Sequence, residues 1–269
     1  MIASSGREKL TDKKFDSAIN EEKYINKLFE RLVAKNIVFN NVDFRYCIFD
    51  AAYLRNCKFQ DCDFTGCRFL NSNLAGSSFY GCKFDYVFFD KTQVDNDILE
   101  IGCPGPENLK LKFARSLRMN YQSLGDAKSA NIAIVIELQA TNDHLYKAWR
   151  SKESYYRKKY RRLKRLRVFA EWINFKVMDY VWGNGESFWK LFRAVFVVLL
   201  AISFFHVFIF NDPSTPVPAF DALLLSPQVL LGIVKPASYP SLYLTAVFLV
   251  RLVMFGFFMS IIIKRFNRR

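Results

Sequence analysis

The chain has 269 residues, a formal net charge of +14 and a hydrophobic content of 51%, which places it among globular or membrane proteins rather than disordered ones. It contains only two histidines, His144 and His206, and shows no phosphate-binding loop, nucleophile motif or carboxylate cluster. The composition therefore argues against an enzyme, and no catalytic residue, metal or cofactor is predicted.

Residues 1–35 are polar and charged, with eight Lys or Arg and six Asp or Glu. A secretory signal peptide needs an apolar core segment, so none is expected here. We expect a helix over about residues 20–35 and interpret residues 1–35 as an N-terminal helical cap.

A strict five-residue repeat follows, in which every fifth residue is Phe or Leu through eleven consecutive units. A period of five fits neither the 3.6 residues of a helix nor the two of a strand, so it predicts a repeat architecture. The residue two places before each Phe or Leu is small or thin, as the narrow interior of a tube would require. The large inward residues are Phe39, Phe44, Phe49, Leu54, Phe59, Phe64, Phe69, Leu74, Phe79, Phe84 and Phe89.

Units such as Asn56-Cys-Lys-Phe-Gln60 and Gly81-Cys-Lys-Phe-Asp85 resemble those of pentapeptide-repeat proteins. The resemblance covers residues 36–95 and implies a short right-handed quadrilateral β-helix with four units per coil. Sixty residues would then give about three coils, stacked ~4.8 Å apart. Some proteins of this family imitate DNA with an acidic face, but residues 36–95 carry seven acidic and six basic residues, which disfavours that function.

The cysteines follow the repeat, because five of the six occupy the small inward position. Their spacings match no common zinc signature, so we expect reduced packing residues in a reducing, cytoplasmic compartment. Cysteines twenty residues apart should stack on adjacent coils, close enough to cross-link if oxidised. The inward cysteines are Cys47, Cys57, Cys62, Cys67 and Cys82.

The segment 96–185 is predicted to be helical, with helices over 107–121 and 127–182 that form a hairpin and then enter the membrane. Cys103–Pro106 is a plausible boundary after the repeat, and Asp126 is placed to cap the second helix. Residues 132–136 alone are equally typical of a short strand.

A strongly basic run precedes the first apolar segment, with eight cations in the eleven residues 157–167. Nucleic acid is one partner for such a run, but a charge cluster beside a membrane span more simply predicts contact with anionic lipid head groups. The cations are Arg157, Lys158, Lys159, Arg161, Arg162, Lys164, Arg165 and Arg167.

Two apolar segments, 194–210 and 242–263, are about 26 and 33 Å long as helices, enough to span a bilayer core of about 30 Å with help from residues 188–192. Lys and Arg flank them on the sides away from the connecting loop 211–241. The positive-inside rule therefore predicts that both termini are cytoplasmic.

A second resemblance concerns Leu117–Asp126, Tyr180–Ser187 and Ala219–Ser226, which are similar to segments of bacterial proteins that join pentapeptide repeats to a two-helix potassium-channel-like module. The resemblance implies a pore helix in the loop and an ion filter after it. The residues Leu231–Pro236 lack the threonine, second glycine and acid of such a filter.

Four residues are candidates for a pore or a selectivity site: Gly232, Lys235, Arg251 and Gly256. Lys235 falls where the filter acid would be, and Arg251 lies near the centre of the second span, where a charge is costly and is by default a functional candidate. The alternative is that Arg251 pairs with a carbonyl or snorkels. Gly256 corresponds to a flexible glycine of the inner helix, or serves close helix packing.

The predicted fold class is mixed: a short quadrilateral β-helix, a helical cytoplasmic segment and an α-helical membrane domain with two transmembrane helices. The expected domains are 1–35 (helical cap), 36–95 (β-helix), 96–185 (helical hairpin and basic juxtamembrane helix) and 186–269 (transmembrane domain with the re-entrant or periplasmic loop 211–241).

The predicted function is an oligomeric channel-like protein of a bacterial inner membrane, whose repeat domain assembles or gates a pore that is not K⁺-selective and is either anion-permeable or nonselective. Two helices cannot enclose a pore alone, so a homo-oligomer is required, and the resemblance implies a tetramer. The expected partners are the lipid bilayer, further copies of the chain and a protein partner or trigger on the repeat, with nucleic acid disfavoured. A stress or antiviral effector that depolarises the membrane is consistent with this; the alternative is a non-conducting, membrane-anchored scaffold that binds a protein.

Overall fold

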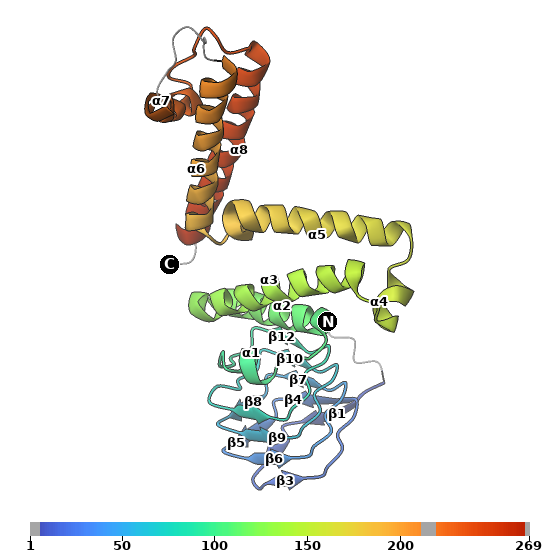
Figure 1. Cartoon of the computed structure of the whole chain (residues 1–269). Helices are drawn as coiled ribbons and strands as arrows, with labels where there is room; N and C mark the ends of the chain where they lie inside the picture. The colour runs from blue at the N-terminus through green and yellow to red at the C-terminus, as the bar shows by residue number, and fades with distance from the viewer. Residues whose placement is uncertain (1–5, 211–218, 267–269) are drawn as a thin grey trace. The chain divides into compact units, whose positions relative to one another are not determined.

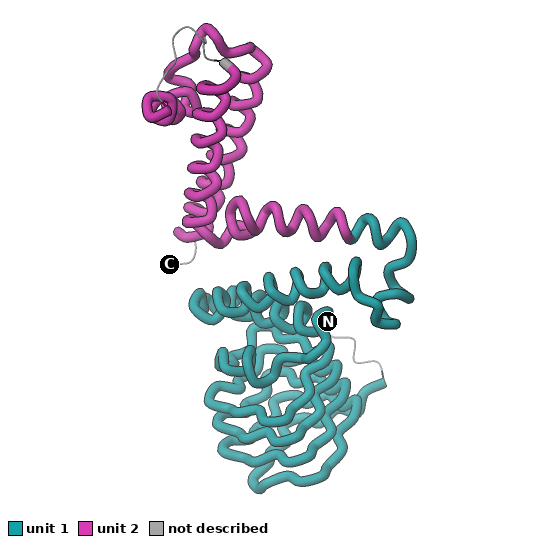
Figure 2. Tube along the Cα trace, in the orientation of Figure 1, with its two compact units in different colours: residues 1–168 teal, residues 169–269 magenta. Residues whose placement is uncertain are grey.

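The computed structural model describes residues 6–210 and 219–266, and the chain divides into two compact units, residues 1–168 and 169–269 (Figure 2). The first eight residues of the predicted loop 211–241 lie outside the described residues, as do the basic residues Arg268 and Arg269. All described strands belong to the first unit, and both long apolar helices belong to the second.

The first unit begins with a parallel β-solenoid of about four turns (Figure 1). Strands on successive turns pair about twenty residues apart, as Phe29 with Phe49 and Phe49 with Phe69. Three sheets and a fourth ladder of single bridges form four faces, as the repeat predicts. The strands are β1 (Glu8–Thr11), β2 (Lys14–Phe15), β3 (Ile19–Asn20), β4 (Lys27–Glu30), β5 (Val33–Lys35), β6 (Val38–Asn40), β7 (Ile48–Asp50), β8 (Tyr53–Arg55), β9 (Lys58–Gln60), β10 (Arg68–Leu70), β11 (Ser78–Tyr80) and β12 (Phe88–Asp90).

The helix expected over residues 20–35 is wrong, because this stretch forms β3, β4 and β5 of the solenoid. The inward positions of the period continue upstream of Phe39 as Ala34 and Phe29, which are both fully buried. Charged residues of this part of the chain pair between turns, where Arg31 binds Asp12 at 2.7 Å. The solenoid therefore has about four turns rather than three.

One residue in each unit turns a corner of the coil with positive φ. Asn36, Asn41 and Asn56 do so at φ of 60°, 51° and 55°, a conformation that Asn, Asp and Gly tolerate best. Gly66 takes the same corner at φ 72°, and a β-carbon there would lie 2.6 Å from the Tyr46 ring. Asn, Asp or Gly takes most of the corners between residues 21 and 91, and other residues such as Tyr46 and Ala51 take the rest.

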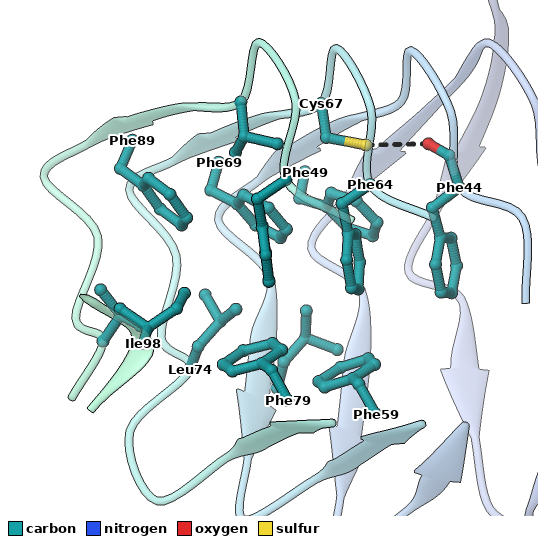
Figure 3. Close-up of a cluster of buried hydrophobic side chains, with 14 of the residues drawn as sticks. Phe44, Phe49, Phe59, Phe64, Cys67, Phe69, Leu74, Phe79, Phe89 and Ile98 are labelled. Carbon is teal, nitrogen blue, oxygen red and sulfur yellow. Dashed lines mark hydrogen bonds between the residues drawn. The ribbon is translucent and has the colours of Figure 1, made fainter. Parts of the chain in front are cut away.

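The core of the solenoid is a set of ring ladders, and the eleven predicted inward residues all lie within it, at 0–3% exposure. Phe49 and Phe69 stack with ring centroids 4.8 Å apart, and Phe69 and Phe89 at 5.2 Å (Figure 3). Offset stacking adds to the burial of aromatic area. The parallel register explains the strict period, since each ring must sit above its equivalent on the previous turn.

The small inward position carries a second ladder, of hydrogen bonds. The Cys67 thiol donates to the Phe44 carbonyl at 2.8 Å (Figure 3), and the Ser72 hydroxyl donates to the Phe49 carbonyl at 3.2 Å. Burial raises the pKa of the Cys67 thiol well above its usual range. Cys and Ser thus occupy equivalent places, where a small side chain satisfies backbone carbonyls.

The solenoid ends under a helical hairpin. Helix α1 (Ile98–Ile101) follows the last turn, and α2 (Glu107–Ser123) lays Phe113 on the rings of Phe84 and Phe89. The Asn120 amide donates to the Thr92 carbonyl at 2.7 Å and its oxygen accepts from the Thr92 N–H at 2.8 Å. Polar side chains of α2 therefore bind the backbone groups that a further coil would bind, and they cover the exposed end of the solenoid.

Replacing Asn120 with alanine should destabilise the last turn, because both Thr92 backbone groups lose their buried partner at about 1–3 kcal/mol each. Hydrogen exchange of residues 88–93 in the full chain should accelerate. The matched variant Gln122→Ala, on the exposed side of the same helix, should leave exchange there unchanged. Equal exchange in the Asn120 variant would show that α2 does not complete the ladder.

The predicted helix over 127–182 is broken into three. Helix α3 (Ala127–Arg150) begins as expected at Asp126, whose carboxylate accepts from the Ser129 N–H at 3.0 Å. The breaks separate α4 (Ser154–Lys159) and α5 (Leu163–Trp182). Arg157 and Arg165 donate to the last carbonyls of α3, those of Ala148 and Trp149, both at 2.6 Å. Part of the basic run thus ends a helix, where cations offset the helix dipole.

A polar cluster joins α3 and α4 to the start of α2. The His144 ring nitrogens lie 3.4 Å from the Tyr156 hydroxyl and 3.1 Å from that of Tyr160. Glu107 accepts from Tyr156, and the Lys159 ammonium lies over the Tyr160 ring. Burial, and then the Lys159 charge, lower the pKa of His144, while Glu107 opposes the shift.

Acidification should therefore loosen the α3–α4 junction. A His of lowered native pKa is neutral in the fold, so its unfolded form binds more protons as pH falls below about 6.5, and stability is lost there. Between pH 7 and 5, the protection factors of residues 144–160, which are corrected for the slower intrinsic exchange in acid, should fall more in wild type than in His144→Gln. The same acid response in both proteins would assign the effect to other groups.

The second unit contains the rest of α5, the 3₁₀ turn η1 (Gly183–Gly185), α6 (Phe188–Phe205), the π-helical turn η2 (His206–Phe210), α7 (Ala219–Leu231) and α8 (Ser241–Phe266). Two segments, Phe188–Ile209 and Ser241–Phe266, are long and apolar enough to cross a bilayer. The short α7 packs through Val229 and Leu230 against Ile202 of α6 and Val247 of α8.

Candidate functional site: a cationic cavity at the end of α7

The end of α7 is built by a glycine turn. The N–H of Ile233 donates to the Gln228 carbonyl at 2.9 Å, and that of Gly232 donates to the Val229 carbonyl at 3.0 Å. This is the Schellman pattern, in which a residue of positive φ, here Gly232 at 74°, ends the helix. The chain at Gly232 and Ile233 is therefore folded back onto the end of α7.

Arg251 completes this helix end from α8. Its Nη1 donates to the Leu231 carbonyl at 2.6 Å, and its guanidinium lies 4.7 Å from the centre of the Phe248 ring. A β-carbon on Gly232 would lie 2.3 Å from Arg251 Nη1, so a side chain there would displace the guanidinium from this position. The cation meets the negative end of the α7 dipole.

These groups border a cavity of about 400 Å³ between α7 and α8. Lys235 and Arg251 supply two cations, and Ser241 and Thr245 supply hydroxyls. None of the residues that line the cavity is acidic. A two-cation, carboxylate-free cavity favours an anion over a cation. Its full lining is Val229, Leu230, Gly232, Val234, Lys235, Ser241, Leu244, Thr245, Val247, Phe248 and Arg251.

The structure brings three of the four predicted pore residues together: Gly232, Lys235 and Arg251 all line this cavity. Gly256 does not line it, and a β-carbon there would meet nothing within 4 Å. Of the two interpretations of Arg251, the described geometry gives it a carbonyl partner. The hydroxyls of Ser241 and Thr245 were missed, although their four-residue spacing, one helical turn, was a readable signal.

The eight basic residues of 157–167 do not form one continuous helix face. Arg157, Lys158 and Lys159 end α4, Arg161 and Arg162 form the link, and the remaining three begin α5. The eleven Phe and Leu residues belong to the solenoid core. Within residues 6–210 and 219–266, no group of three or more His, Cys, Asp or Glu is placed to hold a metal.

Comparisons with known proteins bear on the solenoid alone. The family model "Pentapeptide repeats" matches residues 29–61 and 57–93 with eight copies. Similar solved structures include a pentapeptide repeat protein (Rfr23) from the cyanobacterium Cyanothece 51142, at 13% identity over 33% of this chain and 86% of that chain, with a TM-score of 0.27.

A pentapeptide repeat protein of the Arabidopsis thaliana thylakoid lumen matches at 18% identity over 34% of this chain and 76% of that one, with a TM-score of 0.17. QnrB1, a plasmid-mediated fluoroquinolone resistance protein, matches at 13% identity over 30% and 80%, with a TM-score of 0.14. The search of curated proteins found no match. Residues 29–93 of this chain are therefore pentapeptide repeats, folded as a parallel β-solenoid.

Proposed function

We propose that the chain is an oligomeric membrane protein whose second unit lines an anion-permeable pore, with the cavity at the end of α7 as its selective element. The observation that supports this proposal is that Lys235 and Arg251 line the same cavity, and that no carboxylate lines it. A charged ring of one sign is a known means of choosing ions of the other sign. The same architecture could also form a pore that does not distinguish anions from cations.

K⁺ selectivity is disfavoured by the same geometry. A K⁺ filter replaces the water around the ion with rings of backbone carbonyls. Here the carbonyls of Gln228 and Val229 are bonded within the α7 turn, and that of Leu231 is bonded to Arg251. The guanidinium also places a positive charge where a cation would have to approach.

A symmetric oligomer is part of the proposal, because two spanning helices cannot enclose a pore. Helices α6 and α8 expose large apolar side chains in the single chain, among them Phe196, Phe204 and Phe255. Gly256 offers an open backbone surface, of the kind against which helices pack closely in membranes. A tetramer is the state implied by the resemblance to two-helix channels.

The first unit would assemble the subunits or receive a trigger. Its outer surface carries ion pairs between turns, as Lys9 makes with Glu30, and exposed aromatic residues such as Tyr46, Tyr80 and Tyr86. We place the protein in a bacterial inner membrane with both termini cytoplasmic, because Lys and Arg flank the two apolar helices. A stress or antiviral role through depolarisation fits this arrangement.

A second candidate, a non-conducting anchored scaffold, is favoured by one observation. Arg251 already has a partner within its own chain, the Leu231 carbonyl, so a structural role in holding α7 to α8 accounts for it without a pore. In that case the solenoid would present a protein-binding face and the two helices would only anchor it.

Liposomes that contain the purified full chain separate the two candidates. An anion pore predicts chloride efflux that exceeds potassium efflux when each is measured with a selective electrode. A scaffold predicts efflux of neither chloride nor potassium. The insertion control is a wash with alkaline carbonate, after which the protein should remain in the liposome membrane. Release of the protein by carbonate would contradict both candidates.

A further inference from the structure

A second basic cavity lies at the corner between α5 and α6. The chain turns there through η1, where Gly183 adopts φ 67° and a β-carbon would lie 2.8 Å from Ser187 Cβ. The Ser187 hydroxyl caps α6 by accepting from the Lys190 N–H at 3.3 Å. Within the second unit, α5 runs across the end of α6 (Figures 1 and 2).

The corner borders an open groove of about 500 Å³, lined by three cations and one carboxylate. Lys190 pairs with Asp179 at 2.8 Å, and Arg193 donates from Nη2 to the Tyr180 carbonyl at 2.6 Å. The Arg193 guanidinium also lies 4.2 Å from the centre of the Tyr180 ring, which fixes its plane. The lining residues are Lys176, Val177, Asp179, Tyr180, Lys190 and Arg193.

Helix α5 has an exposed apolar stripe beside this cavity. Ile173, Val177 and Tyr180 are exposed at helical spacing and continue the stripe from Phe169. A helix of this kind lies in the interface between lipid head groups and acyl chains. Trp189, at the first turn of α6, is also exposed and is typical of that level of a membrane.

We propose that the α5–α6 corner binds the phosphate of an anionic phospholipid, with Lys176, Lys190 and Arg193 as its ligands and the α5 stripe in the interface. The cavity carries two net positive charges, and guanidinium and ammonium groups are the natural donors for phosphate. Basic pockets beside spanning helices on the cytoplasmic side recognise lipid head groups. The proposal rests on two parts of the proposed function, the placement of α6 in a bilayer and of this corner on its cytoplasmic side; it does not require conduction.

The test measures how many phosphatidylglycerol molecules the full chain retains in native mass spectrometry from mixed phosphatidylglycerol and phosphatidylcholine micelles. The double variant Lys176→Gln/Arg193→Gln should weaken retention of phosphatidylglycerol by about thirtyfold, since two cations at a membrane surface together contribute on the order of 2 kcal/mol. The matched control Lys35→Gln/Lys58→Gln removes two exposed charges from the solenoid and should retain lipid as wild type does.

Two further measurements test whether the bound phosphate belongs to a lipid and whether the loss in the double variant is due to the missing charge. Inorganic phosphate at millimolar concentration should not displace the lipid; displacement would assign the cavity to a soluble phosphate. Arg193→Lys keeps the charge and should retain more lipid than the double variant. The proposed lipid site would be wrong if the double variant retained as much phosphatidylglycerol as wild type, or if the control variant lost as much as the double variant. Retention without ion efflux would uphold it while contradicting the pore.

Discussion

Replacing Phe64 with alanine should destabilise the solenoid by about 3–5 kcal/mol, the cost of truncating a large core residue. Phe64 is fully buried, and its ring stacks on those of Phe44 and Phe84 at 5.3 and 5.2 Å. It also meets Phe59 edge to face at 5.4 Å. A cavity at this point interrupts the ring ladder that runs from Phe44 through Phe64 to Phe84.

Hydrogen exchange of residues 29–93 in the full chain measures this loss as faster opening of the ladder. The matched variant Tyr80→Ala removes an aromatic ring that is 59% exposed on the outer surface and should change exchange little. If Phe64→Ala exchanged as slowly as Tyr80→Ala, the ring ladder would not be the source of the solenoid's stability.

Replacing Arg251 should change ion selectivity more than any other substitution in the second unit. Arg251→Gln removes the charge and keeps a side-chain donor for the Leu231 carbonyl, whereas Arg251→Lys keeps the charge. In an anion pore, the Gln variant should lose its preference for chloride over potassium and the Lys variant should retain most of it. The relative efflux of the two ions from liposomes measures this preference.

A structural role for Arg251 gives a different pattern. If the guanidinium only holds α7 to α8, both variants should lower thermal stability and neither should alter the ratio of chloride to potassium efflux. Lys58→Gln, on the outer face of β9, serves as the charge control and should match wild type in both measurements. An unchanged ratio in Arg251→Gln would remove Arg251 from the selectivity site.

The repeat was the most predictable part of the fold, because one side chain per unit must stack on its equivalent a turn away. The repeat over residues 6–35 was not predicted. Ala34 takes a position that elsewhere holds Phe or Leu, so the five-residue period is not visible there in the sequence, although β5 pairs with β8 as the later strands pair with one another. The breaks around α4 were also missed, since the basic residues that produce them act by binding the end of α3.

The candidate site was predictable in part. Arg251 stood out because a charge in an apolar span is costly, and Lys235 stood out because it falls where the filter acid would be. That Arg251 reaches the end of α7 depends on a tertiary contact between two helices and on the turn at Gly232, neither of which a linear pattern records. The α5–α6 cavity was missed because Lys176, Lys190 and Arg193 are scattered in the sequence and meet only through the turn at η1.

The most direct measurement is the reversal potential of a planar bilayer that contains the full chain, under a KCl gradient. An anion pore selected by Lys235 and Arg251 predicts a value near the chloride equilibrium potential. A value near the potassium equilibrium potential would contradict the role of the cationic cavity, and a bilayer that holds the oligomer without current would favour the scaffold.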